Sequence, residues 1–564
     1  MSYPRGQPAG AGPSRMRGRP VTLNNSHTDE PIVDVLVIGA GPSGAVVTHT
    51  AAVAGLSVVC LEQGDWVNPS DFPANHPEWE LLIQHDWAHD PNVRALPADY
   101  PVDVTESDMW PVMFNAVGGS SIYYGAEWPR LLPSDFRVKT LDGVGDDWPI
   151  SYDDLKPYHD EVDEFIGVAG VGGDTAYPDG LDYPLPPHPL GKAGVKAAEA
   201  ANKLGWHWWP GTNAIASQKN KTLEQCGRWG VCEWGCPQGA KASFDLIYMP
   251  QAQKAGAKVI TGARVRKVVT DDTGQATGAE WIDRDGNVRF QPARSVVLCA
   301  NGIGTPRLLL LSADERHPDG LANSSGLVGR NLMLHPNCTA VGYYEDNLES
   351  WRGPAGQLIH SMQFYETDKS RGFVRGAKLH ALPTPGPLNT IEAHRELDFD
   401  ELWGPAIHDI ARSSSNGILW AANSEDLPDP DNRVTLSPDQ VDPDGLPAPK
   451  VHYTVSENTR KILKFTVDRM VEAHEAAGAT RIFTTELWVD QPGHLLGTAR
   501  MGEDPATSVV DSYGKSHDVD NLYIADGSIF VTSGSANPTS TISALTLRVG
   551  KKVVENVSAR KAQS

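Results

Sequence analysis

The chain has 564 residues, of which 71 are acidic and 48 are basic, so its formal net charge at neutral pH is −23. A chain of this length can form several domains with a large buried core. The excess of negative charge argues against nucleic acid and anionic membranes as partners. No apolar run reaches the length of a membrane span, so we expect no membrane-spanning segment either.

Residues 1–30 are rich in Gly, Pro, Ser and Arg and lack hydrophobic periodicity, which predicts a disordered tail. Three arginines between Arg15 and Arg19 are basic, but no apolar segment follows them. A secretory signal is therefore not predicted. We expect a cytoplasmic protein and leave open its export together with a partner subunit.

The first ordered segment, from Pro31 to Gly64, has the pattern of a β-α-β unit. Apolar residues from Val33 to Ile38 predict a buried parallel strand, and small apolar residues from Gly44 to Ala54 predict a helix packed on a sheet. A second strand is expected from Leu56 to Leu61.

The turn between this strand and helix contains Gly39, Gly41 and Gly44 at the spacing of a dinucleotide-binding fingerprint. Gly39 permits the tight turn, Gly41 lets the backbone approach a pyrophosphate, and Gly44 lets helix and strand pack closely. Glu62 follows about 20 residues later, at a strand end where a carboxylate can bind a ribose diol. This motif indicates a dinucleotide but does not distinguish NAD from FAD.

Further along the chain, residues 257–300 form a second strand-rich block, with a hairpin turn at Asp283–Gly286 and a buried strand over Ser295–Ala300. A Leu-rich helix is expected from Gly302 to Ser312. The segment 336–480 contains long Pro/Gly/Asp-rich connections and predicts a second domain, mainly an antiparallel sheet. Within this segment, four apolar residues recur at helical spacing and predict a helix over Arg460–Gly478; they are Leu463, Val467, Met470 and Val471.

Several further motifs decide which dinucleotide is expected. They are Val117-Gly-Gly-Ser-Ser121 followed by Arg130 to Phe136, Val296 to Leu309, His494 to Gly502, Asn521 to Ser528, and Ser535 to Thr539. With the glycine-rich turn, this ordered set resembles the glucose-methanol-choline (GMC) oxidoreductases, closest to the gluconate-dehydrogenase and pyranose-oxidase branch. The resemblance covers both ends and the middle of the family's FAD domain, and it implies FAD as cofactor.

The resemblance implies an α/β fold in which a Rossmann-like FAD-binding domain is assembled from discontinuous segments. We assign 31–165, 226–335 and 481–560 to this domain. Residues 336–480 are expected to form an α+β substrate-binding domain with an antiparallel sheet. Residues 166–225 are expected to belong to the substrate domain or to connect the two.

The resemblance also implies positions for cofactor contacts. Val265 matches the residue whose backbone meets the adenine, Asp526 and Gly527 match the pair near the pyrophosphate and ribityl chain, and the stretch from Asn537 matches the pyrimidine side of the flavin. The full predicted set is Gly39, Gly41, Pro42, Ser43, Gly44, Glu62, Gly118, Gly119, Ser120, Ser121, Tyr123, Val265, Ala300, Gly304, Asp526, Gly527, Asn537, Pro538 and Thr539.

One residue departs from the family pattern in an informative way. In fungal pyranose oxidases, a histidine four residues after the second glycine of the Val-Gly-Gly loop bonds covalently to FAD. Tyr123 stands at that place here. We therefore predict that FAD is bound non-covalently.

The expected catalytic pair is His494 and Asn537, which match the family's base and its His-or-Asn position. An imidazole is suited to accept a hydroxyl proton because its unperturbed pKa lies near neutrality. The Asn537 amide can hydrogen-bond the substrate oxygen. His335 also matches a family motif, and we expect a structural role for it, linking the domains.

Cys226, Cys232 and Cys236 follow the spacing C-x5-C-x3-C, and thiolates so placed could ligate an iron–sulfur cluster. Some GMC dehydrogenase subunits resemble this run and carry a three-iron cluster. Many relatives of the gluconate-dehydrogenase branch have a similar loop that is not generally a metal site. A zinc site would need a fourth ligand, and none lies close in sequence. We favour a structural loop and predict no bound metal.

The resulting hypothesis is an FAD-dependent enzyme that oxidises a CH–OH group, most plausibly a secondary hydroxyl of a pyranose or glycoside. Oxygen or another acceptor would reoxidise the flavin. Three tryptophans could stack on a sugar ring, although packing is the commoner role of such residues: Trp206, Trp208 and Trp209.

Alternatives are a sugar or polyol dehydrogenase subunit that passes electrons to a cytochrome or quinone, an aryl or aliphatic alcohol oxidase, and a lyase that binds FAD without redox use. The non-Rossmann motifs argue against an NAD-dependent reductase. The expected partners are a small-molecule alcohol and an electron acceptor, with a homo-oligomer or a small partner subunit left open.

Overall fold

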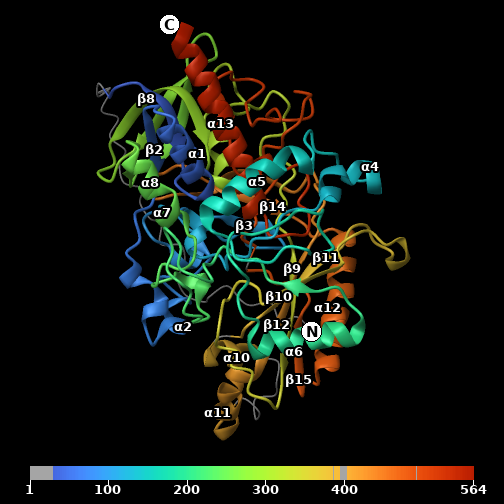
Figure 1. Ribbon diagram of the computed structural model, residues 1–564. Coiled ribbons are helices and arrows are strands. Elements are labelled where there is room, and N and C mark those ends of the chain that lie inside the picture. The colour runs from blue at the N-terminus through green and yellow to red at the C-terminus, as the bar shows by residue number, and fades with distance from the viewer. Residues whose placement is uncertain (1–29, 385, 394–402, 491, 564) are drawn as a thin grey trace.

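A computed structural model describes residues 30–384, 386–393, 403–490 and 492–563. The tail predicted over residues 1–30 therefore lies, apart from Glu30, outside the described residues. The described residues form a seven-stranded, a six-stranded and a three-stranded sheet. The two larger sheets occupy the upper and lower halves of the molecule in Figure 1.

The seven-stranded sheet has a parallel part and an antiparallel part. Its strand order is β5-β2-β1-β8-β7-β6, and β16 pairs with β8. The contacts of β1 with β2 and β8, of β2 with β5, and of β16 with β8 are parallel, whereas β6, β7 and β8 pair antiparallel. The strands are β1 (Val33–Ile38), β2 (Val58–Glu62), β5 (Lys258–Thr261), β6 (Arg264–Thr270), β7 (Ala276–Ile282), β8 (Val288–Leu298) and β16 (Leu522–Ile524).

These strands come from the beginning, the middle and the end of the chain, which is visible as blue, green and red ribbons in the upper half of Figure 1. Every residue of β1 is buried, as expected for a parallel strand covered on both faces. The predicted α/β architecture with a discontinuous Rossmann-like sheet is thus confirmed. The observed β1 has the predicted bounds, and the predicted hairpin turn joins β7 to β8.

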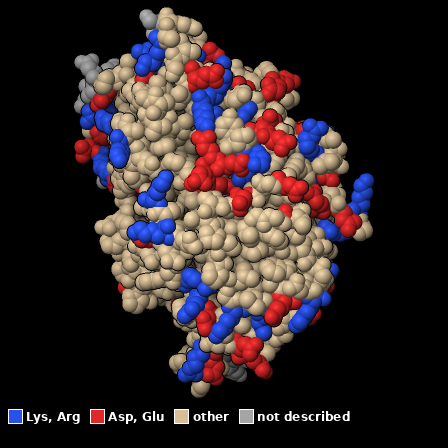
Figure 2. Space-filling model, in the orientation of Figure 1, with Lys and Arg blue, Asp and Glu red and all other residues tan. Residues whose placement is uncertain are grey.

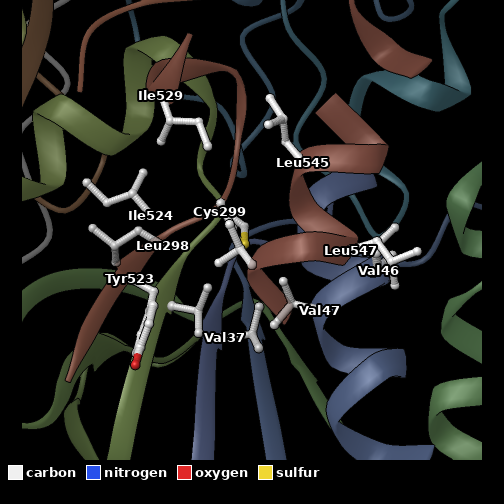
Figure 3. Packing of buried hydrophobic residues seen from close by; sticks show 14 of the residues in the cluster. Val37, Val46, Val47, Leu298, Cys299, Tyr523, Ile524, Ile529, Leu545 and Leu547 are labelled. Atoms are coloured by element: carbon white, nitrogen blue, oxygen red, sulfur yellow. The ribbon is translucent and has the colours of Figure 1, made fainter. Parts of the chain in front are cut away.

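Two helices pack beside this sheet and against each other: α1 (Pro42–Val53) and α13 (Thr539–Gln563). Figure 3 shows Val46 of α1 next to Leu547 of α13, and Val47 of α1 beside the strand residue Val37. α5 (Tyr152–Ile166) packs on the other side of α13. The first and last segments of the chain therefore share one hydrophobic core.

The six-stranded sheet has the order β15-β9-β12-β11-β10-β4, and its neighbours pair antiparallel. This confirms the antiparallel sheet expected from the segment 336–480. Two of its strands come from outside that segment, β4 on one edge and β15 on the other. The strands are β4 (Trp209–Pro210), β9 (Asn337–Tyr343), β10 (Ile359–Phe364), β11 (Ala377–Leu382), β12 (Gly417–Ser424) and β15 (Arg481–Thr485).

Helix α12 (Glu457–Ala477) covers this sheet together with α6 (Gly191–Leu204). It buries Leu463, Val467 and Met470, as the helical spacing predicts. The small third sheet joins β13 (Arg433–Val441), β14 (Pro447–Tyr453) and β3 (Asp103–Ser107). The pairing of β14 with β3 is parallel, so an early segment of the chain attaches to a late one.

Shorter helices connect these layers. They are α2 (Trp79–Leu82), α3 (Pro91–Arg94), α4 (Val138–Asp142), α7 (Phe244–Ile247), α8 (Met249–Lys254), α9 (Asn301–Leu311), α10 (Pro387–Ala393) and α11 (Pro405–Arg412). Within the described residues, no helix combines the length and the apolar character needed to cross a membrane. Figure 2 shows acidic side chains gathered in the upper half of one face, and a band below them with few charged side chains.

Candidate active site

A cavity of about 380 Å³ is lined by residues of both larger sheets. The first sheet contributes the carboxyl ends of β1 and β2, where ligands bind in open parallel sheets. The second contributes residues of β11 and β12. The cavity therefore has an end built from the glycine-rich turn and an end built from the antiparallel sheet, which we call the nucleotide end and the substrate end.

The glycine-rich turn leaves backbone rather than side chains at the nucleotide end. A Cβ atom on Gly41 would meet only Gly119 Cα, 3.9 Å away, so a larger side chain would project into the cavity. A Cβ on Gly44 would lie 1.7 Å from the Gly39 carbonyl oxygen, which explains why helix and strand require glycine there. Gly41 caps α1 without a side-chain hydrogen bond, so the helix N-terminus is available to an anion.

Glu62 lies at the end of β2 and lines the same cavity. Its two carboxylate oxygens accept hydrogen bonds from the Ala40 and Gly64 amides, each at 2.8 Å. Burial raises the pKa of Glu62, and these backbone hydrogen bonds act in the opposite direction. These two hydrogen bonds fix the orientation of the carboxylate. Its remaining lone pairs can accept hydrogen bonds from hydroxyl groups of a ligand.

Asp526 organises the opposite wall of this end. Its carboxylate accepts hydrogen bonds from Thr305 Oγ1 at 2.6 Å, the Asn301 amide at 3.0 Å and the Ser528 amide at 2.9 Å. These bonds join the start of α9 to the turn that begins at Gly527. The early and late motifs of the chain therefore meet at one place.

Almost all predicted cofactor residues line this cavity, and two do not. Gly44 and Gly118 lie behind it and serve packing: a Cβ on Gly118 would meet Asp245 Oδ1 at 2.7 Å. Tyr123 lines the cavity with its ring stacked on Phe114, at a centroid distance of 4.2 Å. The others on the wall are Gly39, Gly41, Pro42, Ser43, Glu62, Gly119, Ser120, Ser121, Val265, Ala300, Gly304, Asp526, Gly527, Asn537, Pro538 and Thr539.

His494 and Asn537 both line the cavity, although they lie 43 positions apart in the sequence (537 − 494). His494 Nδ1 lies 2.9 Å from Nδ1 of the buried His335. Burial, together with the neighbouring His335 and Lys378, holds the pKa of His494 well below its ordinary value. His494 is therefore neutral at physiological pH and able to accept a proton.

Asn537 is held by two donors. Its Oδ1 accepts hydrogen bonds from Lys378 Nζ at 2.5 Å and Asn423 Nδ2 at 2.8 Å. Since the amide oxygen is engaged on the protein side, the amide N–H₂ is the group left to donate toward a ligand. This arrangement suits a role in binding a substrate oxygen.

The substrate end contains ionisable side chains that the sequence did not single out. Lys378 Nζ also donates to Glu127 at 2.6 Å, and His380 Nδ1 lies 3.3 Å from the same carboxylate. Lys378 and His380 alternate with buried apolar residues along β11, and Asn423 stands opposite Lys378 on β12. The sequence pattern that could have identified them is a pair of polar residues at positions i and i+2 of an apolar strand. Such a pair places both polar side chains on the same face of a sheet.

The cysteine loop sits beside this end. Each sulfur accepts a backbone amide hydrogen bond: Cys226 from Arg228 at 3.3 Å, Cys236 from Ala240 at 3.4 Å and Cys232 from Ala355 at 3.5 Å. Lys241 Nζ anchors the loop by donating to the carbonyls of residues 122, 124 and 232. Within the described ranges, no group of three or more Cys, His, Asp or Glu is arranged to hold a metal ion.

The loop also delivers Glu233 to the cavity wall, a residue that the sequence analysis did not identify. Burial, reinforced by Glu127, raises the pKa of Glu233 to about 7. The three tryptophans proposed as a stacking face do not line the cavity. Trp206 packs edge-on against Phe364, and the indole N–H groups of Trp208 and Trp209 bond Asn202 and the Val171 carbonyl.

Comparisons with known proteins agree with this geometry. The chain is 43% identical over 525 residues to the 2-methyl-1,2-propanediol dehydrogenase of Mycolicibacterium austroafricanum, covering 92% of this chain and 94% of that protein. It is 32% identical over 545 residues to the fructose dehydrogenase large subunit of Gluconobacter japonicus, covering 93% and 98%. Its fold matches a formate oxidase of Aspergillus oryzae with a TM-score of 0.63 at 16% identity, covering 93% and 99%.

The family models of GMC oxidoreductases match residues 33–337 and 428–546. These two ranges contain the glycine-rich turn, Glu62, His494 and Asn537, which are the residues brought together around the cavity. The chain belongs to the glucose-methanol-choline family and is an FAD-dependent oxidoreductase that acts on alcohol groups.

Proposed function

We propose that this protein binds FAD non-covalently and oxidises a CH–OH group of a polyhydroxy compound, with a pyranose or glycoside secondary hydroxyl as the leading candidate. The observation that carries the proposal is that His494 and Asn537 share one cavity with the glycine-rich turn. Both catalytic candidates also face Lys378.

The residues on the wall fit FAD along its length. Glu62 would bind the adenosine ribose, and the N-terminus of α1 behind Gly41 would bind the pyrophosphate. The backbone of Val265 would meet the adenine, and Asn537 to Thr539 would lie along the isoalloxazine. Tyr123 in place of a linking histidine supports non-covalent attachment. Bound FAD would supply the two-electron acceptor for a hydride.

The protein's own groups would then perform the proton chemistry. Neutral His494 accepts the hydroxyl proton, and the Asn537 amide donates a hydrogen bond to the same oxygen as negative charge develops on it. Loss of the hydroxyl proton to His494 and of the carbinol hydrogen with its two electrons to the acceptor would leave a carbonyl at the substrate carbon. Lys378, buried beside Asn537, contributes positive charge at this place.

A second candidate is the oxidation of a small vicinal diol, with electrons passed to an acceptor other than oxygen. It is favoured by the relatives, because a diol dehydrogenase and a dehydrogenase subunit are similar over nearly the whole chain. Under either candidate the partners are a small alcohol and an electron acceptor. We keep the prediction of a cytoplasmic location, with a partner subunit or homo-oligomer left open.

An anaerobic reduction screen tests the proposal. Purified protein should be yellow and should release intact FAD on acid or heat denaturation, whereas flavin retained by the precipitated polypeptide would contradict non-covalent binding. Sugars, glycosides, 1,2-diols and aryl alcohols are then added in turn, and bleaching of the flavin identifies the substrate class. Admitting oxygen or an artificial acceptor afterwards separates an oxidase from a dehydrogenase. A flavin that no alcohol bleaches would favour a redox-inactive lyase.

A further inference from the structure

The hydrogen bonds behind His494 determine which of its nitrogens is available as a base. We propose that His335 is a positioning residue that holds His494 in the tautomer with Nδ1 protonated and Nε2 free. This inference rests on the proposed function of His494 and adds a role for His335 beyond the structural one expected from the sequence.

On the side away from His494, His335 contacts two backbone carbonyl groups. Its Nε2 lies 2.6 Å from the Gly534 carbonyl oxygen and 3.2 Å from the Ser533 carbonyl oxygen. Carbonyl oxygens only accept hydrogen bonds, so Nε2 of His335 must carry the proton. Burial lowers the pKa of His335 to about 4, so at neutral pH the ring holds a single proton. Its Nδ1 is therefore unprotonated and can only accept.

The rings of His335 and His494 are in direct contact. His335 Nδ1 lies 2.9 Å from His494 Nδ1, and the rings meet edge to face at an interplanar angle of 89°. Because the His335 nitrogen is an acceptor, His494 Nδ1 must be the donor. His494 is also neutral, since its pKa is well below the ordinary value. The only lone pair left on His494 is then on Nε2.

The two carbonyls that impose this order are themselves fixed. Glu425 Oε1 accepts hydrogen bonds from the Gly534 amide and from Ser533 Oγ, each at 3.1 Å. The same carboxylate faces Arg375, and all three side chains are buried. His335 is fully buried and has a left-handed backbone φ of +49°. The carbonyls that orient His335 are therefore held by a buried, hydrogen-bonded ion pair, and Gly534 lies three residues before Asn537.

Among the described residues, His335 makes the one hydrogen bond to the His494 ring, so its loss would remove the contact that selects between the two tautomers. A His494 ring with the proton on Nε2 would present a donor to the substrate hydroxyl, and proton abstraction would stop. The role is comparable to that of the carboxylate in a Ser-His-Asp triad, where loss of tautomer control slows the reaction by about 10⁴-fold although the geometry is intact.

The test compares His335→Leu with His335→Asn in the FAD-loaded protein. Leucine removes the acceptor, and we expect the rate of anaerobic flavin reduction to fall by about 10- to 10⁴-fold. Asparagine tolerates a left-handed backbone and places an amide oxygen near the Nδ1 position, so it should recover a large part of that rate. The matched control is His474→Leu, because His474 is also buried and bonds a carbonyl, that of Ala340, but does not line the cavity. This control should lose stability and keep its reduction rate.

A second readout does not depend on any substrate. In protein labelled with ¹⁵N-histidine, with His494 assigned by its loss in His494→Gln, the Nε2 shift should be that of an unprotonated nitrogen and should change in His335→Leu. If His494 Nε2 is protonated in the wild-type protein, the proposal is wrong even if His494 is the base. If FAD-loaded His335→Leu reduces at the wild-type rate, or if leucine and asparagine are equivalent, the positioning role is also excluded. A correct tautomer in a protein whose His494→Ala variant reduces normally would instead overturn the proposed function.

Discussion

The two ends of the cavity are built from different materials. The nucleotide end is made largely of backbone, held close by glycines at positions 39, 41 and 44 and oriented by carboxylates that accept main-chain amides. The substrate end is made of buried ionisable side chains, with Lys378, Glu127 and His494 in one connected group. A backbone site depends on space and helix dipoles, whereas the side-chain site depends on charges that stabilise one another. The two should therefore respond differently to substitution.

The largest effect is expected from His494→Ala. FAD should remain bound, because no cofactor-binding motif is altered, while flavin reduction by substrate should slow by about 10²–10⁴-fold, the usual contribution of a general base. Stopped-flow reduction under anaerobic conditions measures this rate, and absorbance measures the bound flavin. Reoxidation of chemically reduced flavin provides the control step. If His494→Ala reduces its flavin at the wild-type rate, His494 is not the base, and the substrate end does not carry the proton chemistry as proposed.

Lys378→Met should damage both stability and chemistry. It leaves the buried Glu127 without its cation, which typically costs about 3–5 kcal/mol, and it frees Asn537 Oδ1 to turn. Denaturant unfolding should show the loss, and flavin reduction should slow. The double variant Lys378→Met with Glu127→Gln should regain stability without regaining the reduction rate. Recovery of both would mean that Lys378 acts only through folding.

Gly41→Val tests the nucleotide end by adding a side chain, whereas the two variants above remove a functional group. The added side chain would point into space next to the turn and would occupy the place of the pyrophosphate. We expect FAD affinity to fall by about 10- to 100-fold, or about 1.4–2.8 kcal/mol, with an unchanged unfolding transition of the apoprotein. Titration of apoprotein with FAD measures the affinity. Gly55→Asn is a control beyond the opposite end of α1, where nothing lies near the Cβ and where asparagine tolerates the left-handed φ of +81°. Unchanged FAD affinity for Gly41→Val would refute the backbone description.

A smaller effect is expected from the pH dependence of Glu233→Gln. The pKa of Glu233 is raised from 4.5 to about 7, so between these values the folded state keeps a proton that the unfolded state has lost. The contribution of this group to stability therefore decreases as pH rises from 4.5 to 7 and is constant above 7. The free energy of unfolding of the variant minus that of the wild type should therefore be larger at pH 8 than at pH 5. Thermal unfolding at the two pH values checks this, and a difference that is independent of pH would contradict it.

The smallest expected effect concerns metal content. If Cys226, Cys232 and Cys236 serve only the loop that carries Glu233, the visible spectrum should be that of flavin alone. Iron analysis should then give values near zero. Stoichiometric iron with a matching paramagnetic signal would reverse this interpretation and would make the cysteine loop a third component of the site.

The sequence by itself predicted the strand, turn and helix that carry Gly39, Gly41 and Gly44, because glycine spacing, helix start and strand end are local features whose geometry is nearly independent of the rest of the chain. It also predicted the bounds of the parallel β1, and it singled out His494, which lies on the cavity wall and whose role as the base stays a prediction. The tertiary structure alone decided that His380 of β11 lines the cavity and that Lys378 of the same strand bonds Asn537, since the register of an antiparallel sheet is set by partners far away in the chain. It likewise placed His335 against His494 across 159 positions and showed that the tryptophans near residue 208 pack elsewhere. Side-chain networks of this kind leave no characteristic spacing in the sequence. They depend on mutual burial and charge pairing, which exist only once the chain has folded.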